Sequence, residues 1–291
     1  NQMKRVLVFV VLAGAFTVQC ANAQRKEFNE VIKKELSYED SSSDKMLEVQ
    51  NLSGSIAIEG YDGTTVLVTV EKTITASNTT NLELGKKEIG IKVINQGDKI
   101  IVYPDVPNMQ YKDGSFTNIN CDRWEESPYE HTLNFRVKVP KKNRIKVGAI
   151  NNGELLVKNT RGSFIEANNI NGGIELLNVT GLTKVRCING AVSISYADNP
   201  TLDSTYYSLN GDINITYQKD LSADIAFKSM NGELFTDFEI EKQFAKTTKN
   251  DSGKKKNAKY KYESKPVVQI GKGGLSFDFE TLNGDVIIKK I

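Results

Sequence analysis

Histidine is the residue type that most often serves as a general acid or base, and this chain has one. Its single histidine, His131, stands at the start of an alternating strand pattern. No nucleophile-elbow sequence that would bring a serine next to it is present. A lone histidine at a strand edge is more consistent with a structural role than with general base catalysis. The sequence therefore predicts no catalytic residue and no enzymatic activity.

Potential metal ligands gather just before this histidine. They are Cys121, Asp122, Glu125, Glu126 and Glu130, together with His131 itself. Their spacing matches no zinc or calcium template. We therefore expect a solvated acidic loop here, and neither a metal site nor a cofactor.

Acidic residues also follow a recurring Asn-Gly pair. They are Glu154, Asp212, Glu233 and Asp285. A row of carboxylates on one face would be typical of a polysaccharide lyase or hydrolase, but Gly173 and Ala191 take the same place in two of the copies. Acidic side chains commonly stabilise turns by hydrogen bonding to nearby backbone groups, and this explains their position more simply. A polysaccharide-active enzyme remains the least favoured alternative.

Aromatic residues give a second hint of ligand binding. The candidates are Tyr196, Tyr206, Tyr207 and Tyr217, which fall in neighbouring repeats, and the only tryptophan, Trp124. Exposed, stacked rings suit the faces of sugars, because aromatic rings offer a large apolar surface with a polar tip. The alternative is that these rings pack at corners or cover the flank of the fold.

The elements that position these residues come from a repeat between Ala149 and Ile291. The Asn-Gly pair recurs six times, at Gly153, Gly172, Gly190, Gly211, Gly232 and Gly284. The first five glycines are separated by 19, 18, 21 and 21 residues. A period of about 20 residues is the signature of a solenoid. The sequence therefore predicts stacked rungs of about 18–21 residues.

The aligned copies share an apolar pattern. Apolar residues stand two and four places after each glycine, as Ile213 and Ile215 do after Gly211, with Thr236 the one exception. Residues two apart face the same side of a strand. Asn-Gly is also a strong hairpin signal, but equivalent columns favour rungs that stack in register. Stacked asparagines could then form an amide ladder.

The N-terminus has the pattern of a signal peptide. Met3-Lys4-Arg5 is positively charged, Val6 to Val18 is apolar, and Ala21-Asn22-Ala23 fits a cleavage site. We expect residues 1–23 to be removed and the protein to be exported to the periplasm or the cell surface. Lipid attachment at Cys20 is the alternative, although Gln19 is larger than the residue that normally precedes such a cysteine.

The expected mature chain carries balanced charge. Residues 1–23 contain Lys4, Arg5 and no acid, so 36 basic and 36 acidic residues remain. This argues against a nucleic-acid partner, which requires a basic excess. Cys121 and Cys187 could pair in an oxidising compartment, or Cys187 could simply occupy a column of small polar residues.

We expect one domain after the leader. Residues 24–46 are predicted to be a polar lead segment, and residues 47–291 the solenoid. Two insertions, from Pro104 to Glu130 and from Gly232 to Gly274, interrupt the rungs and are predicted to be surface loops. No helical period of useful length follows the leader.

These features resemble a known family. The exported N-terminus, the stretch from Asn51 to Asp62, the strand from Phe135 to Pro140 and the serial Asn-Gly rungs are similar to the bacterial "putative adhesin" domain family, related to the auto-transporter adhesin head domain. The resemblance covers roughly Leu47 to Ile291. It implies a β-solenoid in an exported, envelope-associated protein and carries no catalytic residues.

The sequence thus predicts an all-β, single-domain solenoid that acts as a non-enzymatic binding or adhesion protein of the cell envelope. The expected partner is a glycan or an envelope protein. The alternative function is a structural or regulatory scaffold that acts through a protein partner. The ligand and the oligomeric state stay open.

Overall fold

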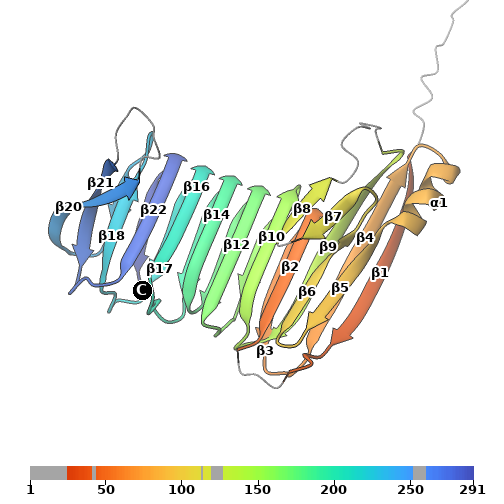
Figure 1. The fold of residues 1–291 in the computed structure, drawn as a ribbon, viewed down its shortest axis with the longest axis horizontal. Helices are drawn as coiled ribbons and strands as arrows, with labels where there is room; N and C mark the ends of the chain where they lie inside the picture. The colour runs from red at the N-terminus through yellow and green to blue at the C-terminus, as the bar shows by residue number, and fades with distance from the viewer. Residues whose placement is uncertain (1–24, 41–43, 113, 119–126, 252–259) are drawn as a thin grey trace, which may run out of the picture.

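The computed structural model describes residues 25–40, 44–112, 114–118, 127–251 and 260–291. Over these residues the protein is elongated, and its strands lie side by side along the long axis (Figure 1). The prediction of an all-β protein is confirmed. No helix in the described part of the chain is long and apolar enough to cross a membrane. The leader and the Cys20 alternative lie outside the described residues.

Two large sheets, here called sheet A and sheet B, contain most of the described strands. Across sheet A the order is β1 (Lys26–Leu36), β4 (Val66–Ala76), β9 (Tyr129–Pro140), β3 (Ile56–Tyr61), β11 (Leu155–Lys158), β13 (Ile174–Val179), β15 (Val192–Tyr196), β17 (Ile213–Tyr217), β23 (Val286–Lys290) and β19 (Leu234–Thr236). Across sheet B the order is β20 (Ile240–Asp251), β21 (Tyr260–Ile270), β18 (Ala223–Lys228), β22 (Ser276–Asn283), β16 (Ser204–Asn210), β14 (Leu182–Asn189), β12 (Phe164–Asn171), β10 (Arg144–Asn151), β2 (Met46–Ser53), β6 (Lys99–Asp105) and β5 (Gly90–Gln96). A separate hairpin pairs β7 (Met109–Lys112) with β8 (Ser115–Asn118).

Each Asn-Gly turn leads the chain from sheet B to sheet A. The turn at Gly172 joins β12 to β13, and the turn at Gly211 joins β16 to β17. The first four copies then pair in parallel within both sheets, in register except for a shift between Leu177 and Val179. The chain therefore does not reverse into a hairpin at these turns, and the apolar columns predicted from the alignment do meet. A Cβ on Gly211 would lie 2.2 Å from the carbonyl oxygen of Gly190, so this close stacking requires glycine.

The predicted asparagine ladder is present. Each side-chain Nδ2 donates to the Oδ1 of the next asparagine over 2.8–3.2 Å, in the order Asn231, Asn283, Asn210, Asn189, Asn171 and Asn151. The extra residue in the first copy is accommodated by Asn152, which adopts a left-handed conformation (φ 55°) and leaves Asn151 in the ladder. Asparagine tolerates this conformation better than most residues.

The rungs do not stack in the order of the sequence at the C-terminal end. β22 and β23, which carry the sixth copy, lie between the fourth copy (β16, β17) and the fifth (β18, β19). The segment between the fifth and sixth copies was predicted to be a surface loop, and this is wrong for most of it. β20 and β21 form a long antiparallel hairpin that extends sheet B beyond β18.

One hydrophobic core joins the two sheets. Apolar residues on the inward faces of both sheets belong to a single buried cluster, as Ile145 and Val147 of sheet B and Leu155 and Val157 of sheet A illustrate. The branched side chains of valine and isoleucine suit this pleated, half-buried setting. Burial of these apolar columns makes the largest favourable contribution to the free energy of folding of the stacked strands.

The N-terminal part departs from regular rungs. β1, in the expected lead segment, pairs antiparallel with β4 along its whole length, from Lys26 opposite Ala76 to Leu36 opposite Val66.

One helix, α1 (Thr79–Glu88), follows β4, so the expectation of no helix is wrong. The helix escapes a periodicity search because it has ten residues and buries only Leu82 and Gly85. Its start is marked locally, since the side chain of Asn78 accepts the N–H of Asn81.

Candidate functional site

The outer face of sheet B carries ordered columns of side chains, because parallel strands in register place equivalent residues beside one another. One column alternates in charge along β2, β10, β12 and β14: Glu48, Lys146, Glu166 and Lys184. The next column runs through Gln50, Gly148, Asn168, Arg186, Tyr207, Glu280 and Lys228. A third column is apolar and lies one residue before the asparagine ladder: Ile150, Ile170, Ile188, Leu209, Leu282 and Met230.

The hairpin of β7 and β8 covers part of this face. Its Tyr111 and Phe116 form an aromatic cluster with Tyr103 of β6, with ring centroids 4.7–6.4 Å apart. The hydroxyl of Tyr111 also donates to the carboxylate of Glu48. The hairpin is thereby fixed over β6 and β2.

Glu48 lies buried beneath the hairpin, with its side chain 1% exposed. Lys99 Nζ lies 2.6 Å and Lys146 Nζ 3.7 Å from its carboxylate oxygens. Burial by itself would raise the pKa of Glu48, but hydrogen bonds from Lys99 and Tyr111 and the charge of Lys146 together lower it. Glu48 is therefore an ionised anchor for the hairpin and faces away from solvent.

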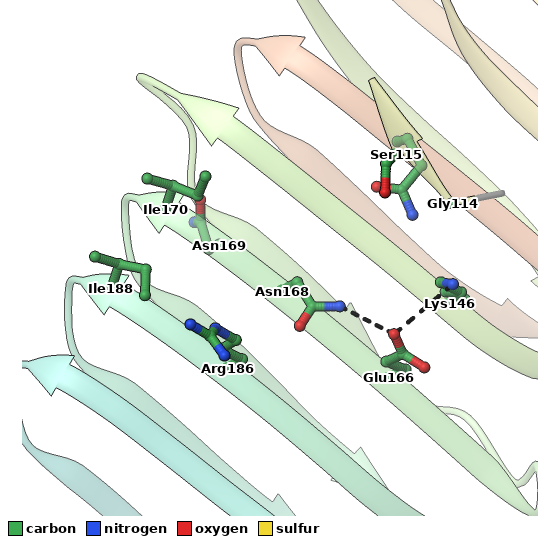
Figure 2. Close-up of a pocket in the computed structure, with 10 residues that line it drawn as sticks. Gly114, Ser115, Lys146, Glu166, Asn168, Asn169, Ile170, Arg186 and Ile188 are labelled. Carbon is green, nitrogen blue, oxygen red and sulfur yellow. Dashed lines mark hydrogen bonds and ion pairs between the residues drawn. The ribbon is translucent and has the colours of Figure 1, made fainter. Parts of the chain in front are cut away.

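A notch of about 370 Å³ opens next to the hairpin (Figure 2). Its walls come from β2, β10, β12, β14 and the tip of the hairpin: Gln50, Gly114, Ser115, Lys146, Glu166, Asn168, Asn169, Ile170, Arg186 and Ile188. Figure 2 shows Ile170 and Ile188 side by side on neighbouring strands, with Ser115 across from them. The notch thus combines an apolar wall with several polar groups, as small-ligand sites commonly do.

The charged groups in the notch differ in how they are paired. Lys146 lies 3.8 Å from Glu166, whose Oε1 also accepts a 3.1 Å hydrogen bond from Asn168. Arg186 instead lies over the ring of Tyr207, 5.0 Å from its centroid. Among the described residues, no carboxylate lies within ion-pair distance of Arg186. Within the part of the chain that the structure describes, Arg186 is therefore the exposed cation of the notch without an anionic partner.

Three of the predicted aromatic residues cannot form a surface platform. Tyr196, Tyr206 and Tyr217 are at most 1% exposed and lie inside the stack. Their hydroxyls form a chain, with Tyr206 Oη 2.7 Å from Tyr196 Oη and 3.1 Å from Tyr217 Oη. Burial raises the pKa of each of these phenols well above its usual value. The rings therefore belong to the core and do not cover the flank of the fold.

The other sequence-based candidates are more dispersed. Tyr207 points outward and is half-buried; it does not line the notch but contacts Arg186, which does. Trp124 and Cys121 lie outside the described residues. Cys187 is buried with a free thiol, 3.2 Å from the carbonyl oxygen of Gly190, in the column that Ser208 also occupies. His131 lies in β9 opposite Ile74, far from these residues in the strand order, and burial lowers its pKa.

Two of the acidic turn residues, Asp212 and Asp285, link the turns of neighbouring copies. Asp212 Oδ1 accepts the backbone N–H of Asp285 over 2.8 Å, and Asp285 Oδ1 accepts that of Glu233 over 2.9 Å. The sequence indicates a role for these residues within their own turns, whereas the two hydrogen bonds join turns of different copies. The described part of the chain contains no group of three or more residues that could hold a metal ion.

Sequence reasoning missed the notch, although a signal for it was available. Lys146, Glu166 and Lys184 each stand five residues before a ladder asparagine, and Asn168 and Arg186 stand three before. In an alignment of the first three copies, the position five residues before the asparagine alternates in charge from one copy to the next. The position of the hairpin over Glu48 has no comparable signal.

Comparison with known proteins gives only distant similarity. No family model and no curated protein matches the chain. The crystal structure of a "putative cell adhesion protein" from Clostridium sporogenes is 12% identical, with 90% of this chain and 100% of that chain covered and a TM-score of 0.43. Those of a "putative adhesin" from Bacteroides fragilis and one from Parabacteroides merdae are 9% and 12% identical, cover 90% of this chain and 97% and 96% of their own, and have TM-scores of 0.27 and 0.29. Similarity this low shows neither a shared fold nor a shared function.

Proposed function

We propose that this chain is an exported, non-enzymatic binding protein of the cell envelope, which presents a ligand notch from a rigid β-solenoid. The observation that carries the proposal is the notch itself. There a cation with no carboxylate partner among the described residues (Arg186), an amide (Asn168) and an apolar wall (Ile170 and Ile188) converge. The stacked strands and the asparagine ladder keep these groups in place, which limits the ordering entropy that binding would cost. The leader from Met3 to Ala23 supports export.

Binding fits the notch better than catalysis does. Glu48 and Glu166 flank Lys146, and two carboxylates beside a base could suggest a polysaccharide-active enzyme. Glu48, however, is sealed under the hairpin by Tyr111 and Lys99 and cannot touch a substrate in the notch. Glu166 alone cannot provide both the acid and the second carboxylate of such a mechanism.

A scaffold that acts through a protein partner is the second candidate, and one observation favours it. The last rung of sheet A, β19, pairs only with β23 among the described strands. Two apolar side chains lie exposed on this rung, Met230 at 76% and Phe235 at 47%. An open strand edge with exposed apolar residues can accept another strand.

Sedimentation of the purified chain with envelope fractions tests the proposed function. The wild-type chain should co-sediment, and Asn168→Trp, which fills the notch, should abolish most of this binding. Asn214→Trp, which enlarges an outward residue of sheet A instead, is the matched control and should bind normally. Binding that survives Asn168→Trp but is lost in Phe235→Asp would support the scaffold candidate instead.

Protease treatment of intact cells tests the location. Release of peptides from β20 (Ile240–Asp251) would support display on the outer surface, whereas protection until the envelope is opened would support a periplasmic protein. Either outcome agrees with export. Recovery of the protein in the cytoplasm with its leader intact would contradict it.

A further inference from the structure

We propose that the notch is a subsite for a carboxylate-bearing sugar, such as a uronate residue of an acidic polysaccharide, and that Arg186 binds its carboxylate. The proposal rests on the proposed binding function and names its ligand class. It starts from the charge balance of the outer face of sheet B.

The cations on either side of β14 have protein partners. Lys99 and Lys146 contact Glu48, and toward the other end of the sheet Lys228 Nζ lies 3.2 Å from Glu280. On β14 itself, both outward cations are exposed and neither has a carboxylate partner among the described residues. Lys184 lies 5.9 Å from the ring centroid of Phe164, and Arg186 lies over Tyr207. The face therefore has a local positive excess at β14, although the expected mature chain is neutral.

Arg186 is suited to a carboxylate in particular. Its guanidinium carbon lies 5.0 Å from the centroid of the Tyr207 ring, a contact that restrains the side chain while its N–H groups can donate to a ligand. A planar fork of this kind matches the two oxygens of a carboxylate. Glu166 also lines the notch, and its negative charge would oppose a doubly charged phosphate more strongly than a singly charged carboxylate.

The rest of the notch fits a sugar ring. Ile170 and Ile188 form an apolar wall that could pack against the C–H face of a pyranose, while Asn168, Gln50 and Ser115 could hydrogen bond to its hydroxyls. The notch is near the lower end of the range of about 300–1,000 Å³ that is typical of small-ligand sites.

The test measures binding of a galacturonic acid tetramer and of the neutral galactose tetramer to the purified chain by calorimetry. We expect the acidic tetramer to bind at least tenfold more tightly and to weaken as salt is raised. Arg186→Ala should lower its affinity at least tenfold, and Arg186→Lys should recover only part of the loss, because lysine lacks the planar fork. Lys228→Ala removes the same charge from the same column, three strands away, and should leave the affinity unchanged.

Several outcomes would overturn the assignment of a carboxylate-bearing sugar as the ligand. They are equal binding of the two tetramers, no binding of either, tighter binding of a sulfated tetramer or of a peptide C-terminus, and equal losses in Arg186→Ala and Lys228→Ala. The proposed binding function is tested separately: envelope binding that survives Asn168→Trp contradicts the notch as a site, whichever tetramer binds. The thermal unfolding midpoint of each variant verifies that it is folded.

Discussion

The side chain of Asn283 donates a 2.8 Å hydrogen bond to Asn210, although 73 residues separate them in the chain. This contact places the last Asn-Gly copy directly on the fourth copy. The fifth copy, with Asn231, is displaced outward and bonds to Asn283 instead. The C-terminal strands are thereby interior members of the stack, with neighbours on both sides.

Cysteine cross-linking should report this order of rungs. Asn214 and Ile287 are register partners on the outer face of sheet A, and neighbouring strands lie about 4.8 Å apart, within the range that a disulfide can bridge. We expect Asn214→Cys with Ile287→Cys to form a disulfide under mild oxidation. Asn214→Cys with Phe235→Cys should not, because β23 lies between them. A disulfide only in the second pair would show that the copies stack in sequence order. Mass spectrometry of digested, unreduced protein identifies the linked peptides.

The asparagine ladder should contribute more at its centre than at its end. Asn210 donates to Asn189 and accepts from Asn283, whereas Asn231 only donates. Because one hydrogen bond contributes about 0.5–1.5 kcal/mol, Asn210→Ala should lower the free energy of unfolding by about 1–3 kcal/mol and Asn231→Ala by about half as much. Urea denaturation measures both. Equal losses would indicate that the alanine changes act through the turn backbone and not through the ladder.

The buried tyrosine chain should make the protein sensitive to alkali. Burial raises the pKa of Tyr196, Tyr206 and Tyr217 in the folded state, while an unfolded tyrosine titrates near a pH of about 10. Their contribution to stability is therefore complete below that pH and is lost as the pH rises, since only the unfolded chain readily releases these protons. Phenolate absorbance should appear together with loss of β-sheet circular dichroism.

Single tyrosine-to-phenylalanine substitutions in the chain of three hydroxyls should lower the stability by different amounts. Tyr206 is the central hydroxyl, so Tyr206→Phe leaves both neighbouring hydroxyls without this partner, whereas Tyr217→Phe removes one contact. We expect Tyr206→Phe to lower the free energy of unfolding by about 1–3 kcal/mol, the cost of leaving buried polar groups unsatisfied. A neutral Tyr206→Phe would contradict a functional hydrogen-bond chain. The triple phenylalanine variant should show a weaker loss of stability at high pH.

Protonation of Glu48 at low pH should weaken the attachment of the hairpin of β7 and β8. The pKa of this carboxyl is lowered in the folded state, so its contribution is complete above the unfolded value of about 4.3 and is lost as the pH falls below it. Glu48→Gln removes the anion that Lys99 and Lys146 contact, and it should lower the stability at neutral pH by about 1–3 kcal/mol.

The control for this change is Glu71→Gln, which removes the exposed partner of Arg136 on sheet A and should have little effect. Hydrogen exchange of the amides of β7 and β8 should accelerate in Glu48→Gln only. Unchanged exchange in the hairpin would show that the aromatic cluster of Tyr103, Tyr111 and Phe116 holds it without Glu48.

Alternation along the strands already indicated which tyrosines are buried. Tyr196 and Tyr217 stand two residues after the inward Ile194 and Ile215, so they face the same side. Tyr206 and Tyr207 are neighbours and must face opposite sides. Grouping all four by residue type, rather than by this parity, led to the prediction of a surface stack.

The sequence by itself determined the repeating rung, because Asn-Gly corners and paired apolar positions are local signals that recur at each copy. From these it also determined the asparagine ladder and the apolar columns. Only the tertiary structure decided that the sixth copy lies between the fourth and the fifth, because equivalent copies offer equivalent stacking surfaces and the local pattern does not rank them. The notch also depends on contacts between segments that are distant in the sequence. Tyr111 donates a hydrogen bond to Glu48, and the tip of the hairpin lines the notch together with Lys146.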